Sequence, residues 1–221
     1  MERQKSNSHS HPLPSVKKDA KYADKLLEMT SPEEIPELWR NTPIEALIMA
    51  QNSGWPIHPG AEPQLLIVTC IEYRYTPPIP RMYAYMIRRA SGRLVGSEFS
   101  VGFVISRGVR HLVLVGHNDC GMVKVPEHAG AVVDALTEQG WNRTLSEQFV
   151  RHYTIKHKIA DELGALEAEY RRLCHIFPKL IIAPLFVDLY DNKLYLPKFY
   201  HEHQLPTHDH VPDDDVFKLI L

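Results

Sequence analysis

The chain has 221 residues, enough for one domain with a sizeable core but not for two full domains. Hydrophobic residues make up 44% and charged residues 24% of it, which excludes wholesale disorder and collagen-like or repeat architectures. Lysine and arginine number 25 against 27 acidic residues, so there is no basic excess for holding nucleic acid. The sequence also lacks an apolar run of the roughly 18 residues that a membrane span needs. We therefore expect neither nucleic acid nor membrane as a partner.

The N-terminus and the cysteines indicate the compartment. The first residues contain no apolar core of a signal peptide and too few arginines for a transit peptide, so a cytoplasmic location is expected. The cysteines are odd in number and widely spaced, which argues against a disulfide framework: Cys70, Cys120 and Cys174. Metal binding, catalysis and simple burial remain open for them.

The N-terminal part reads as a tail followed by helices. Residues 1–14 are polar and without periodicity, which predicts a mobile tail. Apolar residues from Ser15 recur every three or four positions over 15–27, which predicts a helix. Residues 31–34 and 42–45 each offer an N-cap hydroxyl, a proline and then a glutamate, which predicts two more helix starts. We expect N-terminal helices over 15–60, packed around a core.

The core is predicted over residues 61–200. Short apolar runs of the kind that form strands buried on both faces occur at 64–70 and 111–117, and residues 84–90 form a plausible further strand. A fourth strand, a turn at Asp191–Asn192 and a returning strand are expected over 180–197. Strands that alternate with helices imply an α/β fold, with a mainly parallel central sheet flanked by helices and an antiparallel C-terminal edge strand.

Two helical regions and a second tail complete the prediction. Residues 97–108 predict a buried helix, with Ser97 as a candidate N-cap. Residues 129–177 are mostly helical, with a break near Gly140 and an end before Pro178. Residues 201–221 form a tail rich in histidine and aspartate, whose apolar end could dock on the core or on another subunit.

Metal-binding side chains follow two of the predicted strands. Cys70 is the last residue of one apolar run, and His117 and Cys120 directly follow another. In an open parallel sheet, functional side chains gather beyond the carboxyl ends of the strands. If the two strands are neighbours, two thiolates and an imidazole converge in a set suited to Zn²⁺ with a fourth position open. A cysteine that only packs in the core is the alternative.

Charged residues accompany these ligands. Glu72 and Arg74 could pair beside the metal, although an ordinary surface ion pair would have the same spacing. Asp119 could orient a ligand or stabilise a turn. Cys174, in a helical segment, is expected to pack in the core. The absence of a C-x-x-C motif makes a redox-thiol role remote.

Three motifs resemble the β-class carbonic anhydrases, whose signatures are C-x-D-x-R, an R-N-A-like segment and H-x-x-C-G. The corresponding segments here are CIEYR at 70–74, RRASG at 88–92 and HNDCG at 117–121. Glu72 replaces the usual aspartate, and Arg89 stands where the family commonly has asparagine.

The resemblance extends over residues 64–197 and implies a fold and an enzymatic activity. It implies that Cys70, His117 and Cys120 bind Zn²⁺ and that Glu72 and Arg74 form the catalytic pair that controls the fourth position. The implied reaction is the reversible hydration of CO₂ to bicarbonate through a zinc-bound hydroxide. The implied assembly is a homodimer or higher homo-oligomer.

Several alternatives stay open. Glu72 could itself become the fourth ligand and expel water. The same site could hydrolyse carbonyl sulfide or carbon disulfide, or the protein could be a non-catalytic carbonic-anhydrase-like zinc protein. Four tyrosines near the first motif could line a substrate mouth or contact another subunit: Tyr73, Tyr75, Tyr83 and Tyr85.

Overall fold

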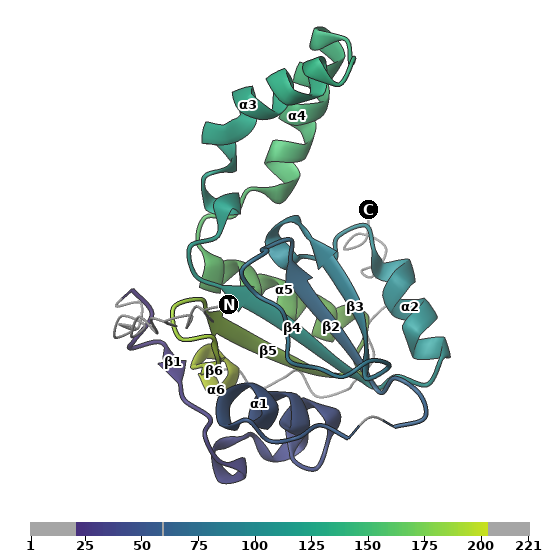
Figure 1. The fold of residues 1–221 in the computed structure, drawn as a ribbon, viewed down its shortest axis with the longest axis vertical. Helices are drawn as coiled ribbons and strands as arrows, with labels where there is room; N and C mark the ends of the chain where they lie inside the picture. Colours follow the sequence, from purple (N-terminus) through teal and green to yellow (C-terminus); the bar gives the residue numbers. More distant parts are fainter. Residues whose placement is uncertain (1–20, 59, 203–221) are drawn as a thin grey trace, which may run out of the picture.

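A six-stranded sheet forms the centre of the molecule (Figure 1). The structure is a computed structural model and describes residues 21–58 and 60–202; the N-terminal tail predicted over 1–14 and most of the tail predicted over 201–221 lie outside these ranges. The strands are β1 (Leu26–Leu27), β2 (Leu65–Cys70), β3 (Ala84–Arg89), β4 (His111–His117), β5 (Ile181–Asp188) and β6 (Lys193–Pro197). Their order in the sheet is β1-β6-β5-β4-β2-β3.

The sheet is mainly parallel, as predicted. Strands β3, β2, β4 and β5 run parallel, and β6 returns antiparallel to β5. The predicted α/β fold class is confirmed. The antiparallel C-terminal strand is present, but β1 pairs antiparallel with it and forms the outer edge.

The predicted helix over 15–27 is wrong where the structure describes it. Residues 21–25 form a turn, and Leu26 and Leu27 belong to β1. The backbone N–H of Lys198 donates to the carbonyl oxygen of Lys25 at 2.9 Å, which continues this pairing. The open edge of β6 supplies long-range hydrogen bonds that outweigh the local helical spacing of apolar residues.

One face of the sheet is covered by α1 (Pro43–Ser53) and by the 3₁₀ turn η2 (Glu37–Trp39), which another 3₁₀ turn, η1 (Pro32–Glu34), precedes. The predicted start at Thr42 is confirmed, since its hydroxyl accepts the N–H of Ile44 at 3.1 Å. The start at Ser31 gives only one 3₁₀ turn. Ile35 follows this turn and precedes Pro36, and a residue before proline is disfavoured in the α conformation.

The other face is covered by α2 (Glu98–Ser106) and α5 (Glu162–Ile176), with the short α6 (Phe199–Glu202) beside them. The prediction that residues 97–108 form a buried helix is only half right. Val101 and Val104 pack on the sheet, but Phe99 is 87% exposed and Phe103 is 55% exposed. Ser97 precedes the helix without making a side-chain cap bond. A single helix can bury only the stripe that faces the sheet, and no described segment covers the opposite side.

The region between β4 and α5 contains the 3₁₀ turn η4 (Gly121–Val123) and a helical hairpin of α3 (Val125–Glu138) and α4 (Arg143–His157). The helices pack on each other and extend away from the sheet (Figure 1). Gly140, with φ +95°, breaks them as predicted. An aromatic row on α4 stays partly exposed, with ring centroids 4.5 Å apart between Phe149 and Tyr153.

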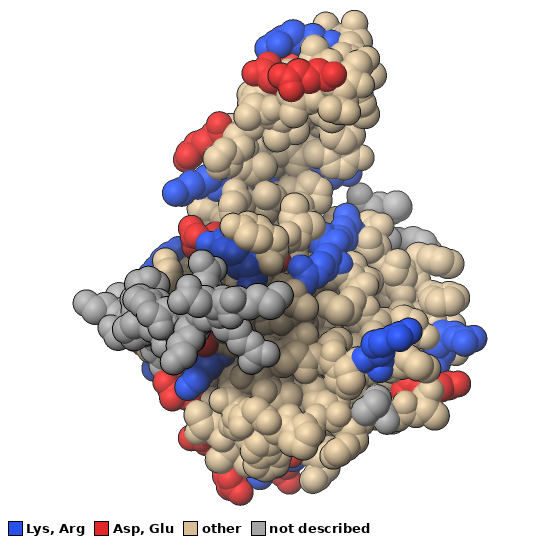
Figure 2. All heavy atoms as spheres, in the orientation of Figure 1, with Lys and Arg blue, Asp and Glu red and all other residues tan. Residues whose placement is uncertain are grey.

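Charged side chains are spread over the face shown in Figure 2. Basic and acidic residues alternate on the hairpin, and Lys or Arg side chains also lie where the hairpin meets the body. In the described ranges, no helix combines the length and apolar character required to cross a bilayer.

Candidate metal centre

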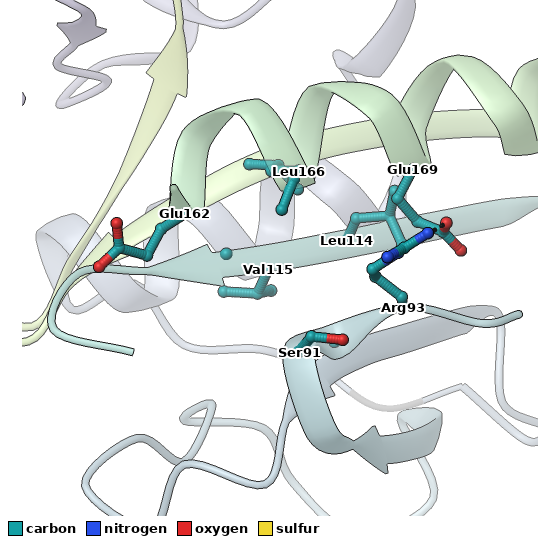
Figure 3. A pocket seen from close by; sticks show the side chains of 10 residues that line it. Ser91, Arg93, Leu114, Val115, Glu162, Leu166 and Glu169 are labelled. Carbon is teal, nitrogen blue, oxygen red and sulfur yellow. Dashed lines mark ion pairs between the residues drawn. The ribbon is translucent and has the colours of Figure 1, made fainter. Parts of the chain in front are cut away.

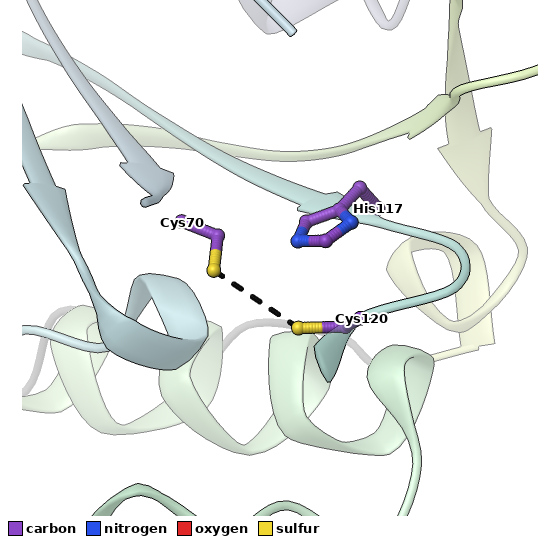
Figure 4. Close-up of side chains that lie close together, drawn as sticks. All are labelled: Cys70, His117 and Cys120. Atoms are coloured by element: carbon purple, nitrogen blue, oxygen red, sulfur yellow. Dashed lines mark hydrogen bonds between the residues drawn. The ribbon is translucent and has the colours of Figure 1, made fainter. Parts of the chain in front are cut away.

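The three predicted ligands meet at the carboxyl ends of two neighbouring strands. Cys70 ends β2 and His117 ends β4, and these strands pair in parallel. Cys120 follows three residues after His117. The candidate ligand atoms of the three side chains all lie within 4.8 Å of one another, and all three residues are buried (Figure 4). The sequence-based expectation that these positions converge is therefore met by the geometry.

His117 presents one ring nitrogen for a ligand. Its Nδ1 lies 2.9 Å from the carbonyl oxygen of Asn118, so Nδ1 carries the proton and donates to that oxygen. Its Nε2 is buried and has no hydrogen-bond partner in the described chain. Burial by itself would lower the pKa of His117, but the adjacent Cys70 sulfur and the Asn118 carbonyl raise it. An unpaired buried nitrogen is unfavourable, and a metal ion would satisfy it.

The two thiols are strongly coupled. Their sulfur atoms lie 4.0 Å apart. The Cys120 thiol lowers the pKa of Cys70 to about 4, and the same contact raises the pKa of Cys120. The pair therefore holds one proton, which a divalent cation would replace. Two sulfurs and one imidazole nitrogen in an apolar setting fit Zn²⁺.

Glu72 and Arg74 form a close ion pair beside this cluster. Arg74 Nε donates to Glu72 Oε1 at 2.8 Å and Nη2 donates to Oε2 at 2.8 Å. The guanidinium and the Arg74 backbone N–H hold the pKa of Glu72 at about 2. Among the described residues, the metal-competent group contains only the two cysteines and the histidine, so Glu72 stands outside it.

The Arg74 guanidinium also contacts the loop after β4, which follows His117 and carries Cys120. Arg74 Nη1 donates to Asp119 Oδ2 at 2.7 Å, and Nη2 donates to the Asp119 carbonyl oxygen at 3.2 Å. From β3, Arg88 donates to the Glu72 carbonyl oxygen at 3.1 Å and to the Tyr75 carbonyl oxygen at 2.7 Å. Side chains from three strand ends therefore fix the loop that follows Cys70.

Comparison with solved structures decides the fold family. β-Carbonic anhydrase isoform I from Trichomonas vaginalis is similar at 20% sequence identity and a TM-score of 0.50, over 67% of this chain and 91% of that one. The chain has the β-carbonic anhydrase fold. A carbonic anhydrase from Glaciozyma antarctica (21% identity, 72% and 98% of the chains, TM-score 0.47) is also similar. So is an apo carbon disulfide hydrolase (16% identity, 77% and 95%, TM-score 0.46). A scan of protein-family models and a search of curated proteins both gave no match.

On this β-carbonic anhydrase fold, Glu162 is a residue that the sequence reasoning missed. It begins α5 and is buried, and its Oε1 accepts the backbone N–H of Cys120 at 3.3 Å. Its other oxygen accepts from Lys21 Nζ at 2.8 Å and from the Tyr22 hydroxyl. Burial opposes ionisation, yet these hydrogen bonds lower the pKa of Glu162. The N-cap Asp161 was a signal for the helix start, but nothing in the sequence placed that start beside Cys120.

Asn118 and Asp188 were also missed. Asn118 is fully buried, and its Nδ2 donates to Asp188 Oδ1 at 3.0 Å. Its Oδ1 accepts the N–H of Leu189 at 2.8 Å. These bonds attach the ligand loop to the end of β5. An amide inside an H-x-x-C motif that directly follows a buried strand was the available signal.

Gly92 approaches the Cys70 backbone closely and also lines a small cavity. Gly92 has φ +67°, and a Cβ there would lie 3.3 Å from the Cys70 nitrogen. Ser91, Arg93, Glu162 and others line a cavity of about 20 Å³, room for a single water-sized molecule (Figure 3).

The remaining predicted residues have other surroundings. Arg89 donates to the Ser97 hydroxyl, at the start of α2. Tyr75 and Tyr83 are buried in the core, so neither lines a substrate entrance or contacts another subunit. Tyr73, by contrast, is 87% exposed. Cys174 packs against the core, as expected.

Proposed function

We propose that this protein is a zinc-dependent carbonic anhydrase that reversibly hydrates CO₂ to bicarbonate. The observation that carries the proposal is the buried cluster of Cys70, His117 and Cys120 at paired strand ends of a β-carbonic anhydrase fold. These residues would hold Zn²⁺. When bound, the metal would supply a Lewis acid that makes water a nucleophile near neutral pH.

Glu72 and Arg74 are assigned the catalytic roles beside the metal. Glu72 stays ionised at any physiological pH because its pKa is about 2, so it can only accept hydrogen bonds. We assign it to accept a hydrogen bond from the reacting water and so orient that water toward CO₂. Arg74 is assigned to hold the Glu72 carboxylate in place through its bidentate pair of hydrogen bonds.

The longer side chain at position 72 is compatible with this assignment. Both Glu72 oxygens are bonded to Arg74, which favours an arrangement in which the carboxylate stands beside the metal and leaves the fourth position to water. The closed alternative, with Glu72 as a fourth ligand, would require that ion pair to break.

The assembly and location are part of the same proposal. We assign residues 61–200 as the zinc-binding core of a cytoplasmic homodimer or larger homo-oligomer. The exposed Phe99 and Phe103 on α2 and the aromatic row on α4 support self-association, because large apolar groups at a surface favour burial against another molecule.

The test combines metal analysis with a stopped-flow assay of CO₂ hydration at neutral and alkaline pH. We expect about one zinc per chain and catalysis that Glu72→Ala reduces severely while zinc content is kept. Zinc with hydrolysis of carbonyl sulfide or carbon disulfide but no CO₂ hydration would favour the hydrolase alternative. Zinc with neither activity would favour a non-catalytic protein, and a folded preparation that never binds zinc would overturn the proposal.

A further inference from the structure

One guanidinium joins the two loops that carry the candidate metal ligands. Arg74 lies four residues after Cys70, and Asp119 lies between His117 and Cys120. The contact between Arg74 Nη1 and Asp119 Oδ2, at 2.7 Å, spans 45 residues of sequence. It therefore ties the end of β2 to the loop after β4.

The two carboxylates use different edges of the guanidinium. Glu72 occupies the Nε and Nη2 edge, whereas Asp119 Oδ2 accepts from Nη1. A guanidinium is rigid and planar, so a partner that fixes one edge also fixes the direction of the other. Asp119 consequently supports the Glu72 contact and does not compete with it.

Glu72 is a side chain that needs such support. Glutamate has one more rotatable bond than the aspartate of the related motif, so holding its carboxylate in one place loses more conformational entropy. Its side chain is only 9% exposed, yet the residue that holds both of its oxygens, Arg74, is 38% exposed. An exposed arginine with a single partner keeps considerable freedom.

We propose that Asp119 is a positioning residue, which fixes the Arg74 guanidinium so that Arg74 holds Glu72 and joins the two ligand loops. The role concerns the proposed metal site, but it does not depend on CO₂ being the substrate. Asp119 acts through Arg74 and needs no contact with substrate.

The competing explanation is that Asp119 serves only the turn. Its φ is +52°, in the left-handed region, where aspartate, asparagine and glycine are tolerated better than alanine. Three variants separate the two roles. Asp119→Asn and Asp119→Gly keep the turn and remove the charged contact, whereas Asp119→Ala removes the contact and also strains the backbone. A pure turn role predicts a defect in the alanine variant alone.

The first readout is the Arg74 Nε–H signal in ¹H–¹⁵N spectra, assigned by its loss in Arg74→Lys, in metal-free and zinc-loaded protein. We expect a resolved, slowly exchanging signal in the wild type and faster exchange in both Asp119→Asn and Asp119→Gly. Because metal-free protein also gives this readout, it tests the role even if the chain proves to have no carbonic anhydrase activity. Wild-type exchange in both variants would overturn the proposal.

The second readout is zinc affinity, measured by competition with a chelator in a double-mutant cycle. We expect Asp119→Asn to weaken zinc binding roughly fivefold, and to change it less than about twofold when Arg74 is already alanine. The loss of a negative charge near the cation acts in both backgrounds and cancels in the cycle. Equal losses in the two backgrounds would mean that Asp119 acts independently of Arg74, contrary to the proposal.

Discussion

The sulfur atoms of Cys70 and Cys120 lie 4.0 Å apart, although 50 residues separate them in the sequence. They come from the ends of β2 and from the loop after β4, which are brought together by a parallel strand pair. Together with the His117 imidazole, these two coupled buried thiols form a ligand set whose charge a cation would neutralise. Metal binding should consequently govern the behaviour of this region.

Replacing a candidate ligand should remove zinc. Cys70→Ser and His117→Ala should each lower the bound zinc from about one per chain to nearly none after dialysis, because three protein ligands are the minimum for a tight site. Both should also lose the increase in melting temperature that zinc gives the wild type. Cys174→Ser is the matched control and should keep its zinc; loss of zinc there would show that the metal lies elsewhere.

Thiol labelling should depend on the metal. Burial raises the pKa of Cys174 to about 11, so at pH 8 only ~0.1% of it is the reactive thiolate. Iodoacetamide should therefore modify the native zinc-loaded protein very slowly. Chelation should allow labelling of Cys70 and Cys120, followed by peptide mass mapping, while Cys174 stays slow until urea is added. Rapid labelling of Cys174 in the native protein would contradict its assignment to the core.

Gly92→Ala should damage the metal site indirectly. The left-handed φ of Gly92 and the approach of a new Cβ to the Cys70 nitrogen should reduce the free energy of unfolding by about 1–3 kcal/mol. Zinc affinity should fall with it, because the strain acts on the Cys70 backbone. Gly102→Ala in α2 is the control: a Cβ there meets nothing within 4 Å and should be neutral or stabilising. Urea titrations of both variants give the comparison.

His157 should make stability depend on pH near neutrality. Burial and the charges of Arg89, Arg93 and Lys156 lower the pKa of His157, which ends α4 where the hairpin meets the body. A histidine with a lowered folded pKa prefers to be neutral in the folded state. Its contribution is therefore complete above its unfolded pKa of about 6.5 and is lost as the pH falls from there toward the folded pKa.

The measurement is the free energy of unfolding between pH 7.5 and 5.5. His157→Gln should have a flatter dependence than the wild type, whereas the matched change at the exposed His152 of the same helix should leave the slope as it is. Equal slopes for the wild type and His157→Gln would show that this histidine does not contribute.

Much of the local structure followed from the sequence. Apolar runs that are continuous over four to eight residues marked β2, β4 and β5, because strands buried on both faces need apolar side chains at every position. The break at Gly140 and the helix start at Thr42 were determined by the conformations that these residues allow. The spacing in H-x-x-C also determined that two ligands would share one loop.

The tertiary structure decided what lies beside these elements. The order that places β2 next to β4, the pairing of Leu26 and Leu27 with β6, and the contacts Cys120–Glu162 and Arg74–Asp119 all join residues far apart in the chain. The local periodicity of apolar residues indicates which side chains are buried, but it does not indicate which residues they pack against. Sheet order and edge pairing depend on the packing of the whole core, so the neighbours of the three ligands became known only from the folded chain.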